Sequence, residues 1–376
     1  MARWVRTADE LARLVDELAG ARAIGIDIEG DSLHHYTEQT CLLQVSSNTG
    51  GAWLVDPLAL DDLSPLAPIF TDPAILKVVH AGDNDVTAMR RDFDFRFRTM
   101  FDTAIAAKLL GDSELGLQAI ARNELGLELT KGSQKDDWSK RPLTAKQEAY
   151  AIADVEHLMD LAARFTHRLA EAGRTEWARE EFAALAGLAE VPRVDDRTGP
   201  DEFRRIKGYA KLSRRKQAVL RELYNWREER ARLADRPPFK IVGADVLLAL
   251  AEASPTDLDD IEDALASYPR QRGESKHIRA AIERGLELPE RDLPSKEAGD
   301  RVAMPAAARR RVEKLRSWRD EQAARSKLEP SIVMSQRLIE RVAIAAPQSI
   351  DELAAIEGVR RWRAKEWGVA ILERVG

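Results

Sequence analysis

The chain has 376 residues, of which 44% are hydrophobic and 32% charged, and a formal net charge of −6. This length exceeds one ordinary domain and predicts two or three. No apolar run approaches the roughly 20 residues of a membrane-spanning helix, and the charged N-terminal segment lacks the apolar core of a secretory signal. The single cysteine, Cys41, excludes an internal disulfide and a cysteine-based zinc cluster. We therefore expect a soluble, cytoplasmic protein with no membrane partner.

The charge is unevenly distributed along the chain. Residues 201–240 hold thirteen Lys or Arg against six Asp or Glu. A basic segment in an acidic chain is compatible with phosphate contacts, and many solvated helix faces have the same composition. Both interpretations stay open at this point.

Strand and helix patterns alternate in the first half of the chain. Three β-rich runs, at 22–29, 40–47 and 52–56, are separated by short polar or Gly-containing turns, as in a meander. The patterns that follow are a helix at 63–70, a buried strand at 75–81, and helices at 84–92, 102–110, 117–125 and 144–169. This order predicts a mixed sheet with helices on its faces. Strand patterns disappear beyond about residue 190.

The helical segments beyond residue 200 repeat each other. Trp226 recurs as Trp318 at an offset of 92. Further pairs in this register are Arg227/Arg319, Ala231/Ala323, Pro238/Pro330, Ala251/Ala343, Pro255/Pro347 and Asp259/Asp351. Because Trp and Pro are uncommon, we infer two copies of one small all-helical domain and expect both tryptophans in its core. Polar segments broken by Pro and Gly, 189–203 and 287–300, are the expected linkers.

Two acidic residues, Asp27 and Glu29, interrupt the apolar strand pattern AIGIDIEG. Side chains two residues apart leave a strand on the same face, so the two carboxylates crowd each other. In one interpretation the strand ends at Asp27 and Glu29 begins a solvated loop. In the other, the carboxylates bind a divalent cation, since unpaired acids near a low-dielectric interior are costly and their oxygens suit Mg²⁺ or Mn²⁺.

Further acids lie in two later motifs. The stretch VVHAGDNDVTAM leaves a strand and enters a helix, which brings Asp85 to the carboxyl end of the sheet, where α/β ligand sites form. We expect Asp83 or Asn84 to cap that helix. Tyr150 and Asp154 are four residues apart and share one face of the long predicted helix. An ordinary amphipathic helix is the alternative for this pair.

Taken in order, the three motifs resemble those of the DEDD superfamily of 3′–5′ exonucleases, Tyr subclass. The stretch KGSQKDDWSKRPL resembles the ribonuclease D segment before the third motif, and the helical repeats resemble the HRDC domain of RecQ-type helicases and ribonuclease D. The resemblance to the ribonuclease D family covers nearly the whole chain. Departures from the family pattern occur beside the site, at Gly30 and Asp136.

The resemblance implies an α/β fold: an RNase H-like mixed-sheet exonuclease domain at 1–190, followed by two small all-α HRDC-like domains at 204–286 and 301–376. The implied activity is two-metal hydrolysis of single-stranded RNA 3′ ends to nucleoside 5′-monophosphates, with transfer-RNA precursors as the expected substrates. The alternatives are a DNA 3′–5′ exonuclease and a nucleic-acid-binding scaffold without hydrolysis. A monomer is expected.

The resemblance also implies roles for individual residues. The catalytic set is Asp27, Glu29, Asp85, Tyr150 and Asp154. Its four acids would hold two divalent cations, Mg²⁺ or Mn²⁺, about 4 Å apart, with Asp27 bridging both and Tyr150 orienting the attacking water. The expected substrate contacts are Lys131, Gln134, Trp138 and Arg141. Among these, Trp138 would offer a stacking surface, and packing onto the long helix is its alternative role.

Overall fold

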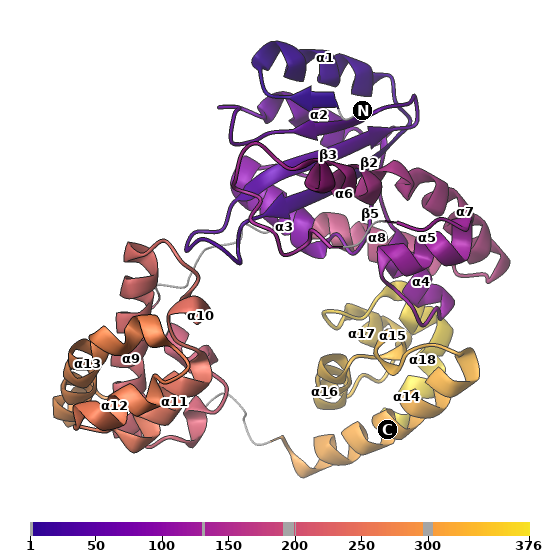
Figure 1. The fold of residues 1–376 in the computed structure, drawn as a ribbon. Helices are drawn as coiled ribbons and strands as arrows, with labels where there is room; N and C mark the ends of the chain where they lie inside the picture. The colour runs from indigo at the N-terminus through magenta and orange to yellow at the C-terminus, as the bar shows by residue number, and fades with distance from the viewer. Residues whose placement is uncertain (1–2, 130–131, 191–198, 200, 296–303) are drawn as a thin grey trace. The chain divides into compact units, whose positions relative to one another are not determined.

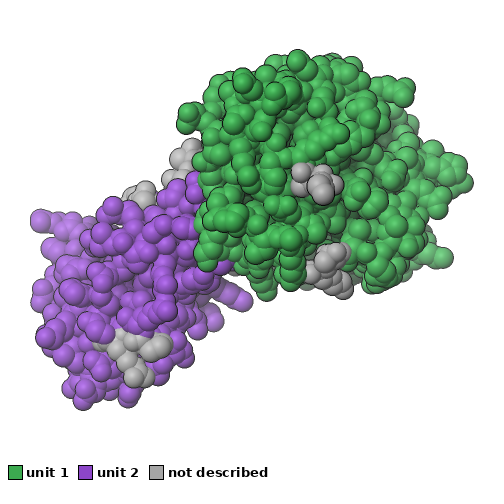
Figure 2. Space-filling view, turned by 45° about the horizontal axis from the view of Figure 1, so that its top comes forward, with its two compact units in different colours: residues 1–30, 40–193, 303–376 green, residues 31–39, 194–302 purple. Residues whose placement is uncertain are grey.

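The computed structural model describes residues 3–129, 132–190, 199, 201–295 and 304–376. It divides into two compact units (Figure 2). Unit 1 comprises residues 1–30, 40–193 and 303–376, and unit 2 comprises residues 31–39 and 194–302. Parts of the two expected linkers, at 191–198, 200 and 296–300, lie outside the described residues. Among the helices that the structure describes, none is long and apolar enough to span a membrane.

Unit 1 is built around a six-stranded sheet with the order β1-β4-β3-β2-β5-β6 (Figure 1). The strands are β1 (Arg3–Val5), β2 (Ala23–Gly30), β3 (Thr40–Ser47), β4 (Ala52–Val55), β5 (Leu76–Val79) and β6 (Met100–Asp102). Strands β2, β3 and β4 pair antiparallel, whereas β1, β5 and β6 join by parallel pairing. The predicted meander and mixed sheet are confirmed. The sequence does not predict β1 or β6, because three residues are too few to show alternation.

Helices pack on both faces of this sheet. They are α1 (Ala8–Ala19), α2 (Ala67–Thr71), α3 (Asp83–Phe93), α4 (Thr103–Leu110), α5 (Leu117–Leu125), α6 (Ala145–Glu156), α7 (Leu158–Glu171) and α8 (Thr175–Gly187). Helix α1 packs on the face that carries Ile24 and Ile26, and α6 crosses the opposite face over β2, β3 and β4 (Figure 1). The prediction of one helix over 144–169 is wrong, because the backbone leaves the helical conformation at His157 (φ −108°, ψ 5°).

Two of these helices begin with the same local arrangement. The Thr7 hydroxyl accepts the Glu10 N–H at 3.3 Å, and the Glu10 carboxylate accepts the Thr7 N–H at 3.1 Å. Thr144 and Gln147 repeat this capping box at the start of α6, with distances of 3.2 and 3.0 Å. Each box satisfies donors that the first helical turn cannot pair internally. The second box therefore sets where α6 begins and which of its side chains face the sheet.

The remaining helices form the two repeated units. The first copy, in unit 2, contains α9 (Arg214–Leu233), α10 (Pro238–Ile241), α11 (Ala244–Ala253), α12 (Leu258–Ala264) and α13 (Ser275–Glu287). The second copy contains α14 (Ala306–Ser326), α15 (Pro330–Val333), α16 (Gln336–Ala345), α17 (Ile350–Ala355) and α18 (Arg361–Val375). Short 3₁₀ helices occupy Ser64–Leu66, Leu188–Glu190, Glu202–Arg205, Tyr209–Lys211, Pro269–Glu274 and Glu290–Asp292.

The backbone confirms the repeat in detail. Asp235 and Lys327, which are 92 positions apart, both adopt the left-handed conformation, with φ of 44° and 54°. Ser254 and Ala346 do the same two helices later, at the ends of α11 and α16, with φ of 50° and 49°. Non-glycine residues rarely adopt this conformation. Its occurrence at two matched positions in both copies is therefore a strong sign that the copies share one architecture. Both repeated tryptophans, Trp226 and Trp318, are buried as predicted.

The two copies contact different parts of the chain. In unit 1 the second copy packs on α8, where the rings of Trp177 and Trp362 stack with centroids 4.3 Å apart. The Trp362 indole N–H donates to Glu181 at 3.1 Å. In unit 2 the first copy packs with residues 31–39, and Asp235 accepts the backbone N–H of Tyr36 at 3.1 Å. The segment that follows β2 therefore belongs to the same compact unit as the first helical copy.

Strand β2 and helix α6 approach most closely at Gly25. A Cβ there would lie 2.5 Å from Ser46 Oγ and 2.9 Å from the Val155 carbonyl oxygen. We expect Gly25→Ala to lower the unfolding midpoint, at a cost of about 1–3 kcal/mol, because the Val155 carbonyl is backbone and cannot rotate away. Urea denaturation measures the change. Gly187→Ala in α8 is the control, since nothing lies within 4 Å of its added Cβ, and equal losses in the two variants would contradict the prediction.

Candidate active site

Carboxylates from β2 and α6 converge on the sheet face beneath α6. One oxygen each of Asp27, Glu29 and Asp154 can be chosen so that all three lie within 4.8 Å of one another. Alternation along β2 places Asp27 and Glu29 on the face opposite Ile24 and Ile26. The strand therefore continues through Glu29, and the alternative in which Asp27 ends the strand is wrong.

Asp85 and Tyr150 border the same site. Together with Asp27, Glu29 and Asp154 they line a cavity of 580 Å³. Asp85 comes from the first turn of α3, and Tyr150 lies one turn before Asp154 on α6. All five residues expected in the catalytic set are thus brought together.

The turn into α3 is held by Asp102, a residue that the sequence analysis did not single out. Its carboxylate accepts the backbone N–H groups of Ala81 and Gly82 at 3.2 and 2.9 Å. It also caps α4 by accepting two N–H groups there. The expectation that Asp83 or Asn84 caps α3 is wrong, because Gly82 is the N-cap and makes no side-chain capping bond. An Asp directly before the helical pattern TAIAAKLL was the available sign of a capping residue.

The environment of the site raises the pKa values of its four acids when no cation is present. Burial, reinforced by the carboxylates of Asp85, Asp154 and Glu29, raises the pKa of Asp27 well above its ordinary value. Burial and neighbouring acids likewise raise the pKa of Glu29 to about 9 and that of Asp85 to about 7. Burial raises the pKa of Asp154 to about 6. A divalent cation would offset this repulsion, and an all-oxygen donor set fits a hard cation. These residues can therefore hold a divalent metal.

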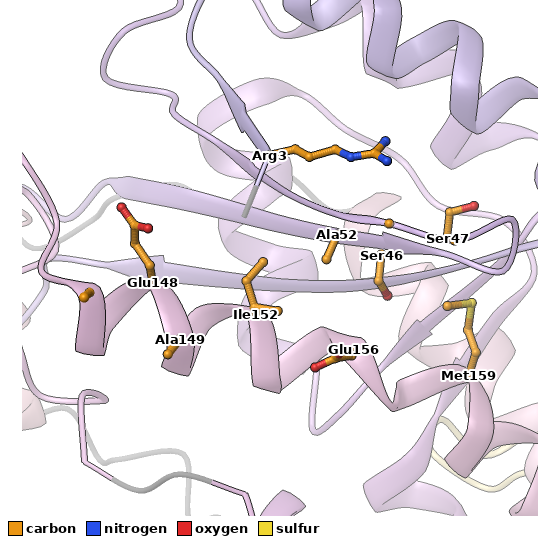
Figure 3. Close-up of a pocket in the computed structure, with 12 residues that line it drawn as sticks. Arg3, Ser46, Ser47, Ala52, Glu148, Ala149, Ile152, Glu156 and Met159 are labelled. Carbon is orange, nitrogen blue, oxygen red and sulfur yellow. The ribbon is translucent and has the colours of Figure 1, made fainter. Parts of the chain in front are cut away.

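A larger cavity of 750 Å³ lies on the other side of α6, against β3 and β4 (Figure 3). Figure 3 shows Glu148, Ile152 and Glu156 along the side of α6 that borders it. Glu148 accepts the Trp4 indole N–H at 3.2 Å. Among the described residues, the acids lining this cavity form no cluster of three. Size alone does not assign function, so the smaller, acidic cavity is the candidate catalytic site.

The predicted substrate contacts have different outcomes. Gln134 is exposed and lines the acidic cavity, where a substrate could reach it. Lys131 lies outside the described residues. A stacking role for Trp138 is wrong for this structure, because its side chain is fully buried and packs near Tyr150, with ring centroids 6.2 Å apart. Trp138 thus takes the alternative role and packs against α6, near Tyr150.

Arg141 was also an expected substrate contact. Its guanidinium instead forms two bonds to Asp56, at 2.8 and 2.7 Å, and donates to the Cys41 carbonyl at 2.7 Å. Because these donors are already used within the fold, the expected substrate contact is corrected to a structural role. The arginine ties the segment before α6 to the central strand β3.

Together, the mixed sheet, the converging acids and the helical repeats define an enzyme of the 3′–5′ exonuclease class. A family model described as 3′-5′ exonuclease matches residues 2–170, and the HRDC domain matches residues 216–271 and 308–375. Ribonuclease D of Pseudomonas paraeruginosa is 30% identical over 376 residues, covering 98% of this chain and 96% of that one. The chain belongs to the ribonuclease D family. The domain boundaries at 190, 204, 286 and 301 stay predictions.

Solved structures show the same relationship. Escherichia coli RNase D is 27% identical, with a TM-score of 0.75, and the match covers 100% of this chain and 98% of that one. The catalytic core of RRP6 from Trypanosoma brucei is 26% identical, with a TM-score of 0.63, and the match covers 76% of this chain and 80% of that one. The predicted fold class and the predicted enzyme class, a ribonuclease D-like 3′–5′ exoribonuclease, are confirmed.

The raised pKa values predict how stability depends on pH when no metal is bound. Between about pH 5 and pH 9 the folded state keeps protons on these acids that the unfolded state has lost, so stability falls as pH rises. We expect Glu29→Gln, measured in EDTA, to raise the unfolding midpoint at about pH 8 and to flatten this decline. The control is Glu156→Gln. Glu156 is an exposed acid at the end of α6 that lines the larger cavity and not the acidic one. Parallel pH profiles for wild type and Glu29→Gln would rule out the expected repulsion.

Proposed function

We propose that the cavity formed by Asp27, Glu29, Asp85, Tyr150 and Asp154 is the site at which the enzyme removes nucleotides from single-stranded RNA 3′ ends. The observation that carries the proposal is the convergence of three carboxylate oxygens within 4.8 Å in a cavity that Tyr150 also borders. The related Escherichia coli enzyme is described as an exoribonuclease involved in structured RNA processing. This description supports RNA over DNA as substrate, with nucleoside 5′-monophosphates as products.

The four acids are proposed to hold two divalent cations, either Mg²⁺ or Mn²⁺. When bound, such a metal pair activates the attacking water and stabilises the leaving 3′-oxygen. Asp27 would be one of the residues that hold them, since burial and the carboxylates of Asp85, Asp154 and Glu29 all raise the pKa of its carboxyl group. The raised pKa values support this assignment, because they mark a site whose charge is balanced only when cations are present.

Tyr150 is proposed to orient the attacking water and not to remove its proton. Burial and the carboxylates of Asp154, Glu29 and Asp27 raise the pKa of Tyr150 far above its ordinary value of 10. The side chain therefore remains a phenol at neutral pH, which is a poor base and a good hydrogen-bond donor. Trp138 packs beside the ring, which limits where the hydroxyl group can point.

Phosphate contacts are proposed for the first helical copy. Arg236, Lys240 and Arg270 line a cavity of 370 Å³ there, together with Tyr268. Cations gathered around a cavity suit a phosphodiester backbone, and binding of this kind weakens as salt rises. We further propose that transfer-RNA precursors are among the substrates and that the enzyme acts as a cytoplasmic monomer, as the family resemblance implies.

A gel time course on 5′-labelled RNA tests the activity and the role of Asp27 together. Wild type with Mg²⁺ or Mn²⁺ should shorten single-stranded RNA stepwise from its 3′ end, and EDTA should abolish the reaction. Asp27→Asn should reduce the rate by ~10²-fold or more, because electrostatic stabilisation of the transition state is lost. DNA of the same sequence is the parallel substrate. Equal rates on DNA would favour the DNA exonuclease alternative, and binding without cleavage under every metal condition would favour the scaffold.

Tyr150→Phe separates water positioning from metal binding. The hydroxyl group is removed while the ring keeps its packing, so we expect kcat to fall by about 10²-fold or more. Calorimetric titration with Mn²⁺ should give an affinity close to that of wild type. An unchanged kcat would show that the hydroxyl group takes no part in the reaction.

A further inference from the structure

Gln44 occupies an unusual position in the middle of β3. It lies directly opposite Asp27 in the antiparallel β2–β3 pair. Side chains opposite each other in such a pair share a face and lie close together. On its other side Gln44 pairs with Leu54 of β4. The side chain therefore leaves the sheet on the same face as the catalytic acids.

The Gln44 amide is buried and lacks any partner within the fold. The residue is 0% exposed, and within the described parts of the chain neither Nε2 nor Oε1 has a hydrogen-bond partner. Burying an unpaired amide costs free energy, whereas an apolar side chain of similar size would cost none. Its neighbours Leu42 and Leu54 belong to an apolar cluster. Packing alone would therefore favour leucine or methionine at this position.

Three other buried groups without a partner have a simpler explanation. The indole nitrogens of Trp138, Trp226 and Trp318 also lack partners, but each indole contributes a large apolar body to a core. The next residue on the same face of β3, Ser46, uses its hydroxyl group to donate to the Val155 carbonyl at 2.7 Å. The Gln44 side chain ends in its amide and has no comparable contact. Its nearest acidic neighbour across the strand pair is Asp27.

We propose that Gln44 is a positioning residue for Asp27, and this inference rests on the proposed function of the site. When Asp27 ligates metal it is ionised, and Gln44 Nε2–H donates to the Asp27 carboxylate oxygen and holds that carboxylate in the orientation that ligation requires. An amide suits this task because it donates a hydrogen bond without adding charge. A Lys or Arg in its place would compete with the cation for Asp27. Partners of this kind orient ligands, and their removal typically costs 10–100-fold in metal affinity or activity.

The test compares Gln44→Leu and Gln44→Met with Ser46→Ala, a change on the same strand and face that lies opposite Gly25 instead of an acid. Thermal unfolding in EDTA, calorimetric titration with Mn²⁺, and the kcat and KM for 5′-labelled RNA are measured for each. Both Gln44 variants should unfold at or above the wild-type midpoint, because an unpaired amide is removed. They should bind Mn²⁺ about 10–100-fold more weakly, with a lower kcat and an unchanged KM. Ser46→Ala should show the reverse: a lower midpoint and unchanged Mn²⁺ affinity.

The possible outcomes separate this inference from the proposed function. Failure of wild type to bind Mn²⁺ would defeat the proposed function itself. Wild-type Mn²⁺ affinity in both Gln44 variants would overturn the positioning role alone. A lowered midpoint in EDTA for both Gln44 variants would show that the amide stabilises the fold without metal, which also overturns the inference. Methionine is included because its unbranched shape follows that of glutamine, so a loss seen only with leucine would reflect shape and count against a role for the amide.

Discussion

Repulsion among buried carboxylates is the constraint on which the catalytic part of the molecule depends. Oxygens of Asp27, Glu29 and Asp154 lie within 4.8 Å of one another, and Asp85 lines the same cavity. Burial raises the pKa of each of these acids, and the neighbouring carboxylates raise those of Asp27, Glu29 and Asp85 further. Such an arrangement persists only where the surrounding structure stabilises it. The clustered acids thus lower the local stability of the metal-free protein, and the same clustering favours the binding of cations.

The surrounding fold supplies that stabilisation through contacts that avoid the acids themselves. Asp102 fixes the turn that delivers Asp85, and Gly25 permits α6 to lie directly over β2. Arg141 ties the segment before α6 to β3 through Asp56 and the Cys41 carbonyl. These supports come from separate parts of the chain. The geometry of the site is therefore a property of the whole sheet and its helices, and no single motif contains it.

Local sequence patterns predict much of this architecture. Alternation and buried apolar runs predicted β2 to β5, and the resemblance to the exonuclease motifs pointed to the five residues that the structure brings together around one cavity. Short elements such as β1 and β6 carry too few residues for a pattern. The apolar stripe of α6 continues into α7, so the interruption at His157 leaves no trace in the periodicity.

Roles that depend on contacts distant in sequence were harder to predict. The Gly82 N–H is satisfied by Asp102, 20 residues away, and not by the nearby Asp83 or Asn84. Tryptophan and arginine side chains suit RNA contacts as well as structural roles, so the sequence does not decide between the two roles for Trp138 and Arg141. The burial of Trp138 and the pairing of Arg141 with Asp56 show that both support the fold. Gln44 lies in an ordinary strand pattern, and its importance becomes visible only through its cross-strand neighbour.

The continuation of β2 into residues 31–39 affects how far the enzyme can be dissected. Glu29 and Gly30 end the strand, and the next nine residues pack with the first helical copy, where Asp235 holds the backbone of Tyr36. A fragment ending near residue 190 would keep every catalytic acid but remove the packing partner of the segment directly after them. Such a fragment would therefore differ from the intact chain in the segment that directly follows β2, because residues 31–39 belong to the same compact unit as the first helical copy.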